Sequence, residues 1–351
     1  MTQTADERKQ KWLDFIDVHT GINTIVLVNY VGADEEPRPW PYPQNHQARI
    51  DWAVASYHRQ MENTAWLDDD HIPVATPYTG TEIFAEAFGC KVHYSGDNMP
   101  FALPKIKSAA ELSRIKQPSV HHSTLSNIFE IAAKIRQRVG MDAIFQLPDI
   151  QSPVDIAALV WEKADFLMTM VDDPQAIKEI SAITEQLLTE FLDEWFKEFG
   201  TDYIAHYPQY MMRKGFTFSE DEIGEFSADM FVAYCLDPIN RLSDRYGGCG
   251  MHCCADAYHQ WEKFKLIHGL RLINLVLPSE LLDQAGSFFE DKICHWHMAR
   301  SSSSSDHSLI PSWAEKCSNQ AHLVLEANAT TRSEAIDLAK RLRAFEDSRR
   351  A

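Results

Sequence analysis

The chain has 351 residues, of which 45% are hydrophobic and 24% are charged, the composition of a globular protein with a sizeable core. Its formal net charge of −18 argues against a nucleic-acid partner, because binding to phosphates depends on Lys and Arg. No apolar run is long enough for a membrane-spanning helix, and the polar N-terminus does not resemble a signal peptide. Seven cysteines without disulfide-framework spacing favour a reducing compartment, so we expect a cytoplasmic protein.

The first third of the chain predicts helices that alternate with short buried strands. A run of three acids, Asp68 to Asp70, is expected to be a solvated turn. The loop over residues 32–44 contains four prolines, and loops of this length are often functional. The predicted elements are a helix over 6–18, a strand over 24–28, a helix over 45–66, a strand over 72–75 and a helix opening at 79–81.

The middle of the chain shows the clearest alternation of strand and helix. Ser123 or Ser126 begins a helix that runs to Val139, with Gly140 at its C-terminal end. Ser152 can cap a helix that starts at Pro153. The remaining predictions are a strand over 142–147, an amphipathic helix from 173 to 200, a strand over 203–206 and a long loop over 207–225.

The last third continues the pattern with near-continuous apolar strands. We predict strands ending at His252 and spanning 270–277, 292–297 and 322–328, with a helical run over 258–268 and a closing helix over 333–345. This alternation predicts a parallel sheet covered on both faces. About eight strands favour one (β/α)8 TIM barrel with an N-terminal helical extension, a single domain over 1–351 with its core at about 20–345. The serine run 301–305 is either a mobile loop on the active-site face or an insertion without a role.

A cluster of metal-binding residue types follows the strand that ends near residue 252. On a strand, His252 and Cys254 point to the same face, with Cα atoms roughly 6.5–7 Å apart. An imidazole and a thiolate at that separation can share one zinc ion, whereas Cys253 points to the opposite face and packs. The alternative is that the cysteine is a small buried hydrophobe and that the histidine only satisfies a backbone carbonyl.

Barrel enzymes place their catalytic groups at the carboxyl ends of strands. A polar group in that position also has a simpler explanation, as a satisfied hydrogen-bonding partner of its neighbours. The convergence of several such groups in one mouth favours a functional site. The residues that this rule selects are Asp149, Gln151, His206, Tyr207, His252, Cys254, His297, Glu326 and Asn328.

Three stretches, residues 218–221, 225–231 and 267–274, flank the His-Cys cluster in a recognisable order. Together with the cluster they give, in chain order, an acidic pair, a helix opening at a serine, a strand ending in His-x-Cys and an Ile-x-Gly-Leu-Arg-x-Ile-Asn strand. This order resembles the uroporphyrinogen decarboxylase superfamily. Within it, the chain is more similar to the cobalamin-dependent methyltransferases than to the decarboxylases proper, over roughly residues 65–345.

The resemblance implies a zinc-dependent methyltransferase that exchanges a methyl group between a corrinoid (cobalamin) protein and a small molecule. The family site is His-x-Cys with a second cysteine after the last strand, but residues 325–330 contain no cysteine. We therefore expect His252, Cys254 and either Glu326 or His297 as ligands, with an open fourth position. Asp221 matches the acidic pair and is assigned to substrate positioning or proton transfer. Asp149 is assigned a catalytic role, and the expected substrate-binding residues are Gln151, His206, Tyr207 and Asn328.

Two other functions stay open. The first is a decarboxylase or lyase of a small acid or tetrapyrrole, using Asp149, His252 and Glu326 as an acid–base pocket. A uroporphyrinogen decarboxylase needs arginines in its first strand loop to bind eight carboxylates, but residues 24–47 hold only Arg38, which argues against that substrate. The second is a barrel that binds a ligand or a corrinoid partner without turnover.

Overall fold

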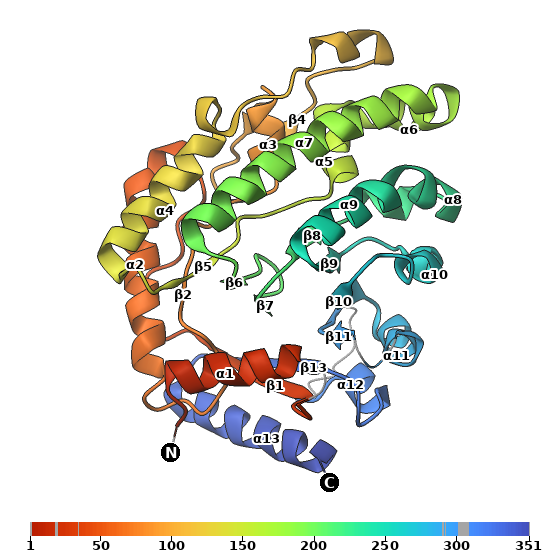
Figure 1. The fold of residues 1–351 in the computed structure, drawn as a ribbon. Coiled ribbons are helices and arrows are strands. Elements are labelled where there is room, and N and C mark those ends of the chain that lie inside the picture. The colour runs from red at the N-terminus through yellow and green to blue at the C-terminus, as the bar shows by residue number, and fades with distance from the viewer. Residues whose placement is uncertain are drawn as a thin grey trace. The chain divides into compact units, whose positions relative to one another are not determined.

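The computed structural model describes residues 2–17, 20–33, 35–289, 291, 293–300 and 309–350. The serine run 301–305, predicted to be a mobile loop or an insertion, lies outside them. The chain divides into two compact units, whose helices and strands are labelled in Figure 1. Unit 1 comprises residues 1–37, 55–74 and 271–351, and unit 2 comprises residues 38–54 and 75–270.

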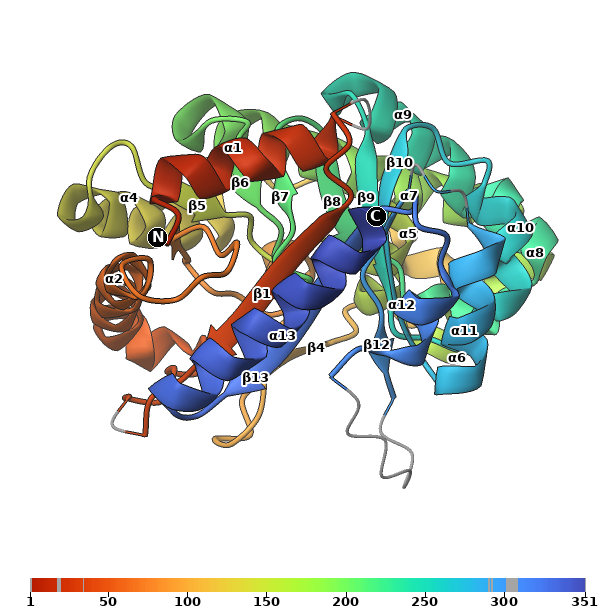
Figure 2. The same ribbon diagram turned by 90° about the horizontal axis from the view of Figure 1, so that it is seen from below.

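Unit 1 is built on parallel strands. Strand β1 (Thr24–Tyr30) pairs with β13 (Leu323–Ala329), from Thr24 opposite Leu323 to Tyr30 opposite Ala329. Beyond β13 come β11 (Cys294–His295) and β10 (Leu270–Leu277), and β10 also pairs with β12 (Met298–Ala299). Helix α13 (Arg332–Arg350) lies along β1 and β13 (Figure 2). The other helices of unit 1 are α1 (Ala5–Ile16), α11 (Ser279–Phe288) and α12 (Ser312–Lys316).

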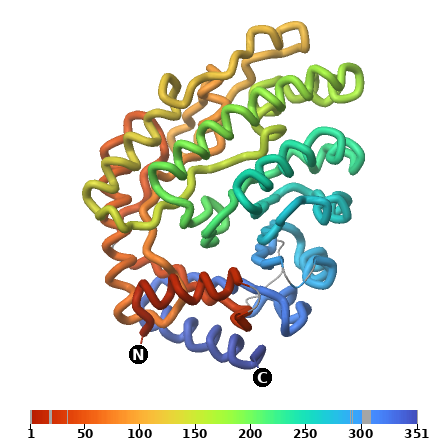
Figure 3. The backbone as a smooth tube through the Cα atoms, in the orientation of Figure 1, coloured from red at the N-terminus to blue at the C-terminus, as the bar shows by residue number. Residues whose placement is uncertain are grey.

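The acidic run at residues 68–70 is not the solvated turn that the sequence predicted. Asp69 and Asp70 are fully buried, because cations far away in sequence pair with them. Asp69 pairs with Arg8, and Asp70 pairs with Lys11 and Arg343. The same carboxylates accept hydrogen bonds from backbone amides of β1. The run therefore ties the first helix, the first strand and the last helix of the chain together within unit 1, where both chain ends lie (Figure 3).

Unit 2 also contains parallel strands. Strand β5 (Ile144–Gln146) pairs in parallel with β6 (Tyr203–Ile204), and β7 (Met211–Met212) runs antiparallel to β6. Strand β8 (Phe216–Ser219) pairs in parallel with β9 (Cys249–Cys253). A single parallel bridge joins Gln151 to Ser219. The remaining strands are β2 (Val74–Ala75), at the boundary of the units, and the antiparallel pair β3 (Lys91–His93) and β4 (Phe101–Leu103).

The long helices of unit 2 follow the predicted signals. Helix α7 (Pro174–Phe199) begins after Asp173, whose side chain caps it, and ends at Gly200, whose φ of 87° suits a residue without a Cβ. Ser152 caps α5 (Pro153–Val160) as predicted. The other helices are α2 (His46–Asn63), which runs on into unit 1, α3 (Ile83–Ala87), α4 (Leu125–Val139), α6 (Lys163–Asp172), α8 (Ala228–Met230), α9 (Asp237–Tyr246) and α10 (Trp261–Phe264).

Two segments differ from the prediction. The expected loop over 207–225 contains β7 and β8, because Phe216-Thr217-Phe218-Ser219 is a short stretch of β-favouring residues that pairs with β9. The helical run expected over 258–268 is reduced to one 3-10 turn (Tyr258–Gln260) and α10. None of the helices in the described part of the chain has the length and apolar character needed to cross a membrane. The fold is of the α/β class, as predicted.

Candidate metal and acid–base site

The parallel pairing of β8 and β9 positions the candidate site in unit 2. Ser219 lies opposite His252 in the register, and the backbone amide of Glu220 donates to the His252 carbonyl at 2.9 Å. The carboxyl ends of the two strands therefore lie at one edge, and the residues that follow them meet there. Asp221 follows β8, whereas Cys254 follows β9.

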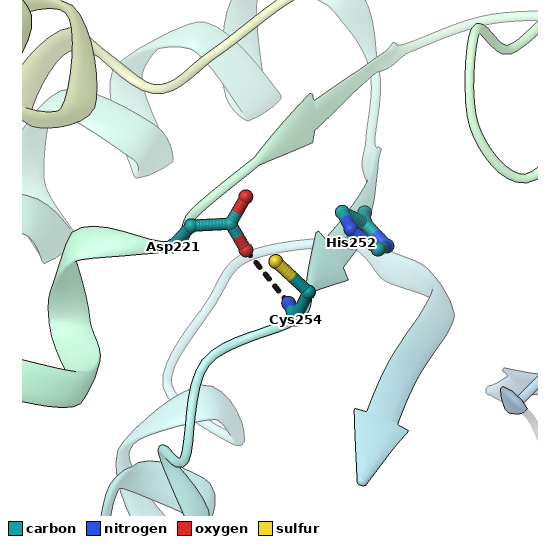
Figure 4. Close-up of side chains that lie close together, drawn as sticks. All are labelled: Asp221, His252 and Cys254. Atoms are coloured by element: carbon teal, nitrogen blue, oxygen red, sulfur yellow. Dashed lines mark hydrogen bonds between the residues drawn. The ribbon is translucent and has the colours of Figure 1, made fainter. Parts of the chain in front are cut away.

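Three side chains of types that can ligate a metal ion converge at this edge. The ligand atoms of Asp221, His252 and Cys254 all lie within 4.8 Å of one another. Figure 4 shows the Asp221 carboxylate beside the Cys254 sulfur, with the Cys254 backbone amide donating to Asp221 Oδ1 at 2.7 Å. His252 is buried, Asp221 is half-buried and Cys254 is exposed. The cluster therefore combines fixed ligands with an accessible side.

The donor set fits a zinc ion. Zinc binds imidazole nitrogen, thiolate sulfur and carboxylate oxygen at about 2.0–2.3 Å, so ligand atoms on one ion lie roughly 3–4 Å apart. The three ligand atoms lie within 4.8 Å of one another, which is close to that spacing. Burial, together with the charge of Asp221, raises the pKa of the Cys254 thiol to about 12. Because a cation reverses this preference and favours the thiolate, metal binding and loss of that proton are coupled.

A buried carboxyl group supports the loop that carries Asp221. Asp155, on α5, accepts hydrogen bonds from the backbone amides of Asp221 at 2.7 Å and Glu222 at 3.1 Å. Glu220 is fully buried next to it. Burial, with the charges of Glu220 and Asp221, raises the pKa of Asp155 well above its ordinary value. Burial, with the charges of Asp221 and Glu222, raises the pKa of Glu220 to about 7, although hydrogen bonds with Ser152 and Asp155 oppose this shift. Both shifts favour the protonated form of the two neighbouring groups. Asp155 thereby fixes the backbone on which Asp221 stands.

A second pair of groups lies after β5 and β6. The buried carboxylate of Asp149 approaches the His206 ring, with Oδ2 at 3.5 Å from Nε2. Burial raises the pKa of Asp149, and the nearby His206 and His252 oppose that shift. Burial lowers the pKa of His206, and the Asp149 charge opposes it. Both shifts bring the two groups toward a neutral pair, which suits proton transfer near neutral pH.

Aromatic contacts connect the acid–base pair with the metal-ligating cluster. The Tyr207 ring stands edge-on against the His252 ring at 4.7 Å between centroids. The Tyr78 ring is parallel to the His206 ring at 6.1 Å, and the Arg38 guanidinium lies 3.5 Å over Tyr78. All of these residues belong to unit 2. Arg38, which is the one Lys or Arg among residues 24–47, therefore stacks on an aromatic ring beside the site.

The structure brings seven of the predicted residues together in unit 2: Asp149, Gln151, His206, Tyr207, Asp221, His252 and Cys254. Gln151 is buried at the bridge to Ser219. Cys253 is fully buried, as predicted for a packing residue. Sequence reasoning missed Tyr78, whose φ of 33° is rare for a residue with a Cβ and has no signature in the sequence.

The other predicted residues, His297, Glu326 and Asn328, belong to unit 1. His297 is buried, with Nε2 at 3.2 Å from His295 Nδ1, and burial lowers its pKa well below the ordinary value. Glu326 accepts a hydrogen bond from Trp296 Nε1 at 3.0 Å. Asn328 is exposed on β13. Metal binding by His297 or Glu326 and substrate binding by Asn328 stay predictions.

Ionisable groups that follow the carboxyl ends of parallel strands occupy the position in which α/β barrel enzymes carry their active sites. The sequence profile of uroporphyrinogen decarboxylase (URO-D) matches residues 75–275, more than half of the chain. The chain therefore belongs to the uroporphyrinogen decarboxylase family, which confirms the predicted resemblance.

One solved structure, a methyltransferase from Methanosarcina mazei, has a similar fold. The TM-score is 0.66 at 12% sequence identity, with 98% of this chain and 99% of that chain covered. At this identity the similarity concerns the fold alone. No curated protein matches the sequence.

Proposed function

We propose that the protein is a metal-dependent methyltransferase that moves a methyl group between a corrinoid protein and a small molecule. The observation that carries the proposal is the convergence of Asp221, His252 and Cys254 within 4.8 Å. Membership of the URO-D family and the fold of a methyltransferase support it. The closed (β/α)8 barrel and the single domain over 1–351 stay predictions, as does a cytoplasmic location.

In the proposed site, His252, Cys254 and Asp221 hold a zinc ion. Asp221 is the third ligand in this proposal, a role for which the sequence suggested Glu326 or His297. Its own predicted role was substrate positioning or proton transfer. When bound, the ion supplies a Lewis acid that lowers the pKa of a thiol or water and so makes a nucleophile at neutral pH. The Cys254 amide holds Asp221 Oδ1, which leaves the other carboxylate oxygen to serve as a ligand.

The remaining residues of the site orient groups and move protons. Tyr207 packs against the His252 ring and limits its rotation. Asp149 and His206 stand next to His252 and can take or return a proton of the substrate. Gln151, buried at the neighbouring bridge, is assigned to substrate binding with His206 and Tyr207.

The test is methyl transfer by the full chain loaded with zinc. Methylcobalamin is offered with a series of small thiols, and cob(I)alamin is offered with methylated amines, ethers and thioethers, while the cobalamin absorption spectrum is followed. The proposal predicts turnover with at least one compound and its loss in Cys254→Ala, whereas Cys317→Ala, a buried cysteine of unit 1, keeps it. Turnover that is unchanged in Cys254→Ala would exclude the proposed mechanism.

The second candidate is a lyase or decarboxylase of a small acid. The specific observation in its favour is the Asp149–His206 pair, which could exchange a proton with a substrate without any metal. Carbon dioxide release by zinc-free protein, abolished in Asp149→Asn, would identify this function. A protein that binds cobalamin with no turnover in either assay would instead be a non-catalytic partner.

A further inference from the structure

Helix α6 in unit 2 is apolar on two opposite faces. Its buried residues are Phe166, Thr169 and Met170, which lie together on one side of the helix. Met168 and Val171 lie on the other side, and they are 63% and 71% exposed. A helix at the surface of a soluble protein normally carries polar residues on its outer side. The exposed side of α6 therefore has the character of a surface that another molecule covers.

The hairpin of β3 and β4 presents a second exposed apolar surface in the same unit. Within the described part of the chain these strands pair only with each other, and an isolated two-stranded sheet is marginally stable. Lys91 lies opposite Leu103, which is 42% exposed. On the same face, His93 lies opposite Phe101, which is 49% exposed, and their rings are 4.9 Å apart between centroids. We call these four residues the hairpin face.

The α6 face is defined in the same way by the residues that recur on the exposed side of the helix. They are Ala164, Met168, Val171 and, at its edge, Asp172, and all four are exposed. Each face therefore combines apolar side chains with at least one charged residue that water surrounds.

The two faces belong to segments of opposite charge. Residues 91–107, which include the hairpin, contain three lysines and one aspartate. Residues 162–175, which include α6, contain four acidic residues and one lysine, and that lysine pairs with Glu222. Among the described residues, neither Lys91 nor Asp172 has an ion-pair partner. The charges of each face are therefore complementary to those of the other.

Backbone hydrogen bonds fix the positions of the two faces within one copy of the chain. The Lys105 amide, just after β4, donates to the Val160 carbonyl at 2.8 Å, and the Glu162 amide, just before α6, donates to the Ile106 carbonyl at 2.9 Å. The hairpin and the helix are thus neighbours. In a pair of copies related by a two-fold axis, every contact occurs twice. Two neighbouring, complementary faces can therefore form two equal contacts about one axis, which closes the assembly at two copies.

We propose that two copies of the chain form a symmetric dimer in which the hairpin face of each copy packs on the α6 face of the other. The apolar side chains of both faces are buried in the contact, and the opposite charges of the two segments select this pairing. A contact of hairpin with hairpin, or of α6 with α6, would bring like charges together and is disfavoured. The association does not involve the metal cluster, so it is expected whether or not the chain transfers methyl groups.

Sedimentation equilibrium of the full chain tests the proposal. Because the contacts are small, we expect a dissociation constant in the micromolar range. Met168→Asp and Leu103→Asp should each weaken the dimer by about tenfold or more, since a charge replaces an apolar contact. Met141→Asp is the matched control, because Met141 is 74% exposed and lies outside both faces. This control should keep the dissociation constant of the wild type.

The charges of the two faces are tested separately. Lys91→Glu and Asp172→Lys should each weaken the dimer, whereas Lys340→Glu, an exposed change on α13 of unit 1, should not. Added salt should weaken the wild-type dimer, since exposed charges are screened. Equal dissociation constants in Lys91→Glu, Asp172→Lys and the wild type would overturn the proposed pairing.

A mixture of two variants tests which face meets which. In a mixed dimer of Met168→Asp and Leu103→Asp chains, the unchanged hairpin face of the first meets the unchanged α6 face of the second. The mixture should therefore dimerise more tightly than either variant alone. A mixture no tighter than its components, a wild type that stays monomeric up to about 1 mM, or full dimerisation of either aspartate variant would overturn the proposal. Thermal unfolding of each variant confirms that it folds, and because the two faces are changed on separate elements, one unstable variant leaves the others to decide.

Discussion

The buried carboxylate of Asp70 provides a quantitative test of how unit 1 is held together. It accepts hydrogen bonds from Arg343 at 2.7 and 2.8 Å, from Lys11 at 2.8 Å and from the Val26 amide at 2.8 Å. Asp70→Asn keeps the shape but removes the charge, which leaves the partly buried Lys11 and Arg343 with Glu346 and, for Arg343, the exposed Asp68. Breaking a buried ion pair from one side costs about 3–5 kcal/mol.

This cost converts to a shift in melting temperature. The entropy of unfolding of a chain of this length is about 0.7 kcal/mol/K, so we expect Asp70→Asn to melt roughly 4–7 °C below the wild type. Asp68→Asn is the matched control, because Asp68 is 54% exposed and its carboxylate lies 3.7 Å from the same arginine. An exposed pair contributes only about 0–1 kcal/mol. Equal melting temperatures of the two variants would refute the reasoning.

The stability difference between the wild type and Asp70→Asn should change with pH in a definite direction. Burial favours the neutral carboxyl, but the hydrogen bonds and charges of Arg343 and Lys11 outweigh it and lower the pKa of Asp70. A lowered pKa contributes stability above the ordinary value, about 3.9, that is lost as the pH falls through the value in the folded protein. The difference between wild type and Asp70→Asn should therefore be constant near neutral pH and shrink below about pH 4. A difference that grows in acid would contradict this account.

Two further predictions concern the site. Asp155→Asn weakens the support of the Asp221 and Glu222 amides, so zinc affinity should fall about 10–100-fold. Competition with a chromogenic chelator measures this affinity, and an unchanged affinity would show that the loop needs no such support. Asp149→Asn should lower the rate of methyl transfer about 10²–10⁴-fold. Because burial raises the pKa of Asp149, the wild-type rate should begin to fall, as the pH is lowered, at a pH above the ordinary aspartate pKa of about 3.9. If Asp149→Asn keeps both the wild-type rate and the same decrease at low pH, Asp149 takes no part in the mechanism.

Much of the fold was predictable because local signals and tertiary packing agree. Helix α7 has a capping aspartate, a proline in its first turn and a closing glycine, and its apolar residues lie on one buried face. The strands β1, β10 and β13 are long enough for their apolar runs to be read directly. Strand β8 has only four residues and was read as loop, since its stability comes from pairing with β9 rather than from its own sequence.

The site was predictable in part. His252 and Cys254 were selected from their spacing, and the structure brings their ligand atoms together. Asp221 was noticed in the sequence but given a different role, because its position beside Cys254 depends on the register between two strands that are distant in the chain. Asp69 and Asp70 were misread for the same reason, since their partners Arg8 and Arg343 lie far away in sequence.

Zinc content is the most direct measurement of the central claim. Protein purified without a tag or chelator is compared with Cys254→Ala, Asp221→Asn and the control Cys317→Ala by elemental analysis after dialysis. The account predicts about one zinc per chain in the wild type and the control, with loss in the other two variants. Zinc that stays at full content in Cys254→Ala, or its absence from the wild type even after incubation with the metal, would contradict the proposed site.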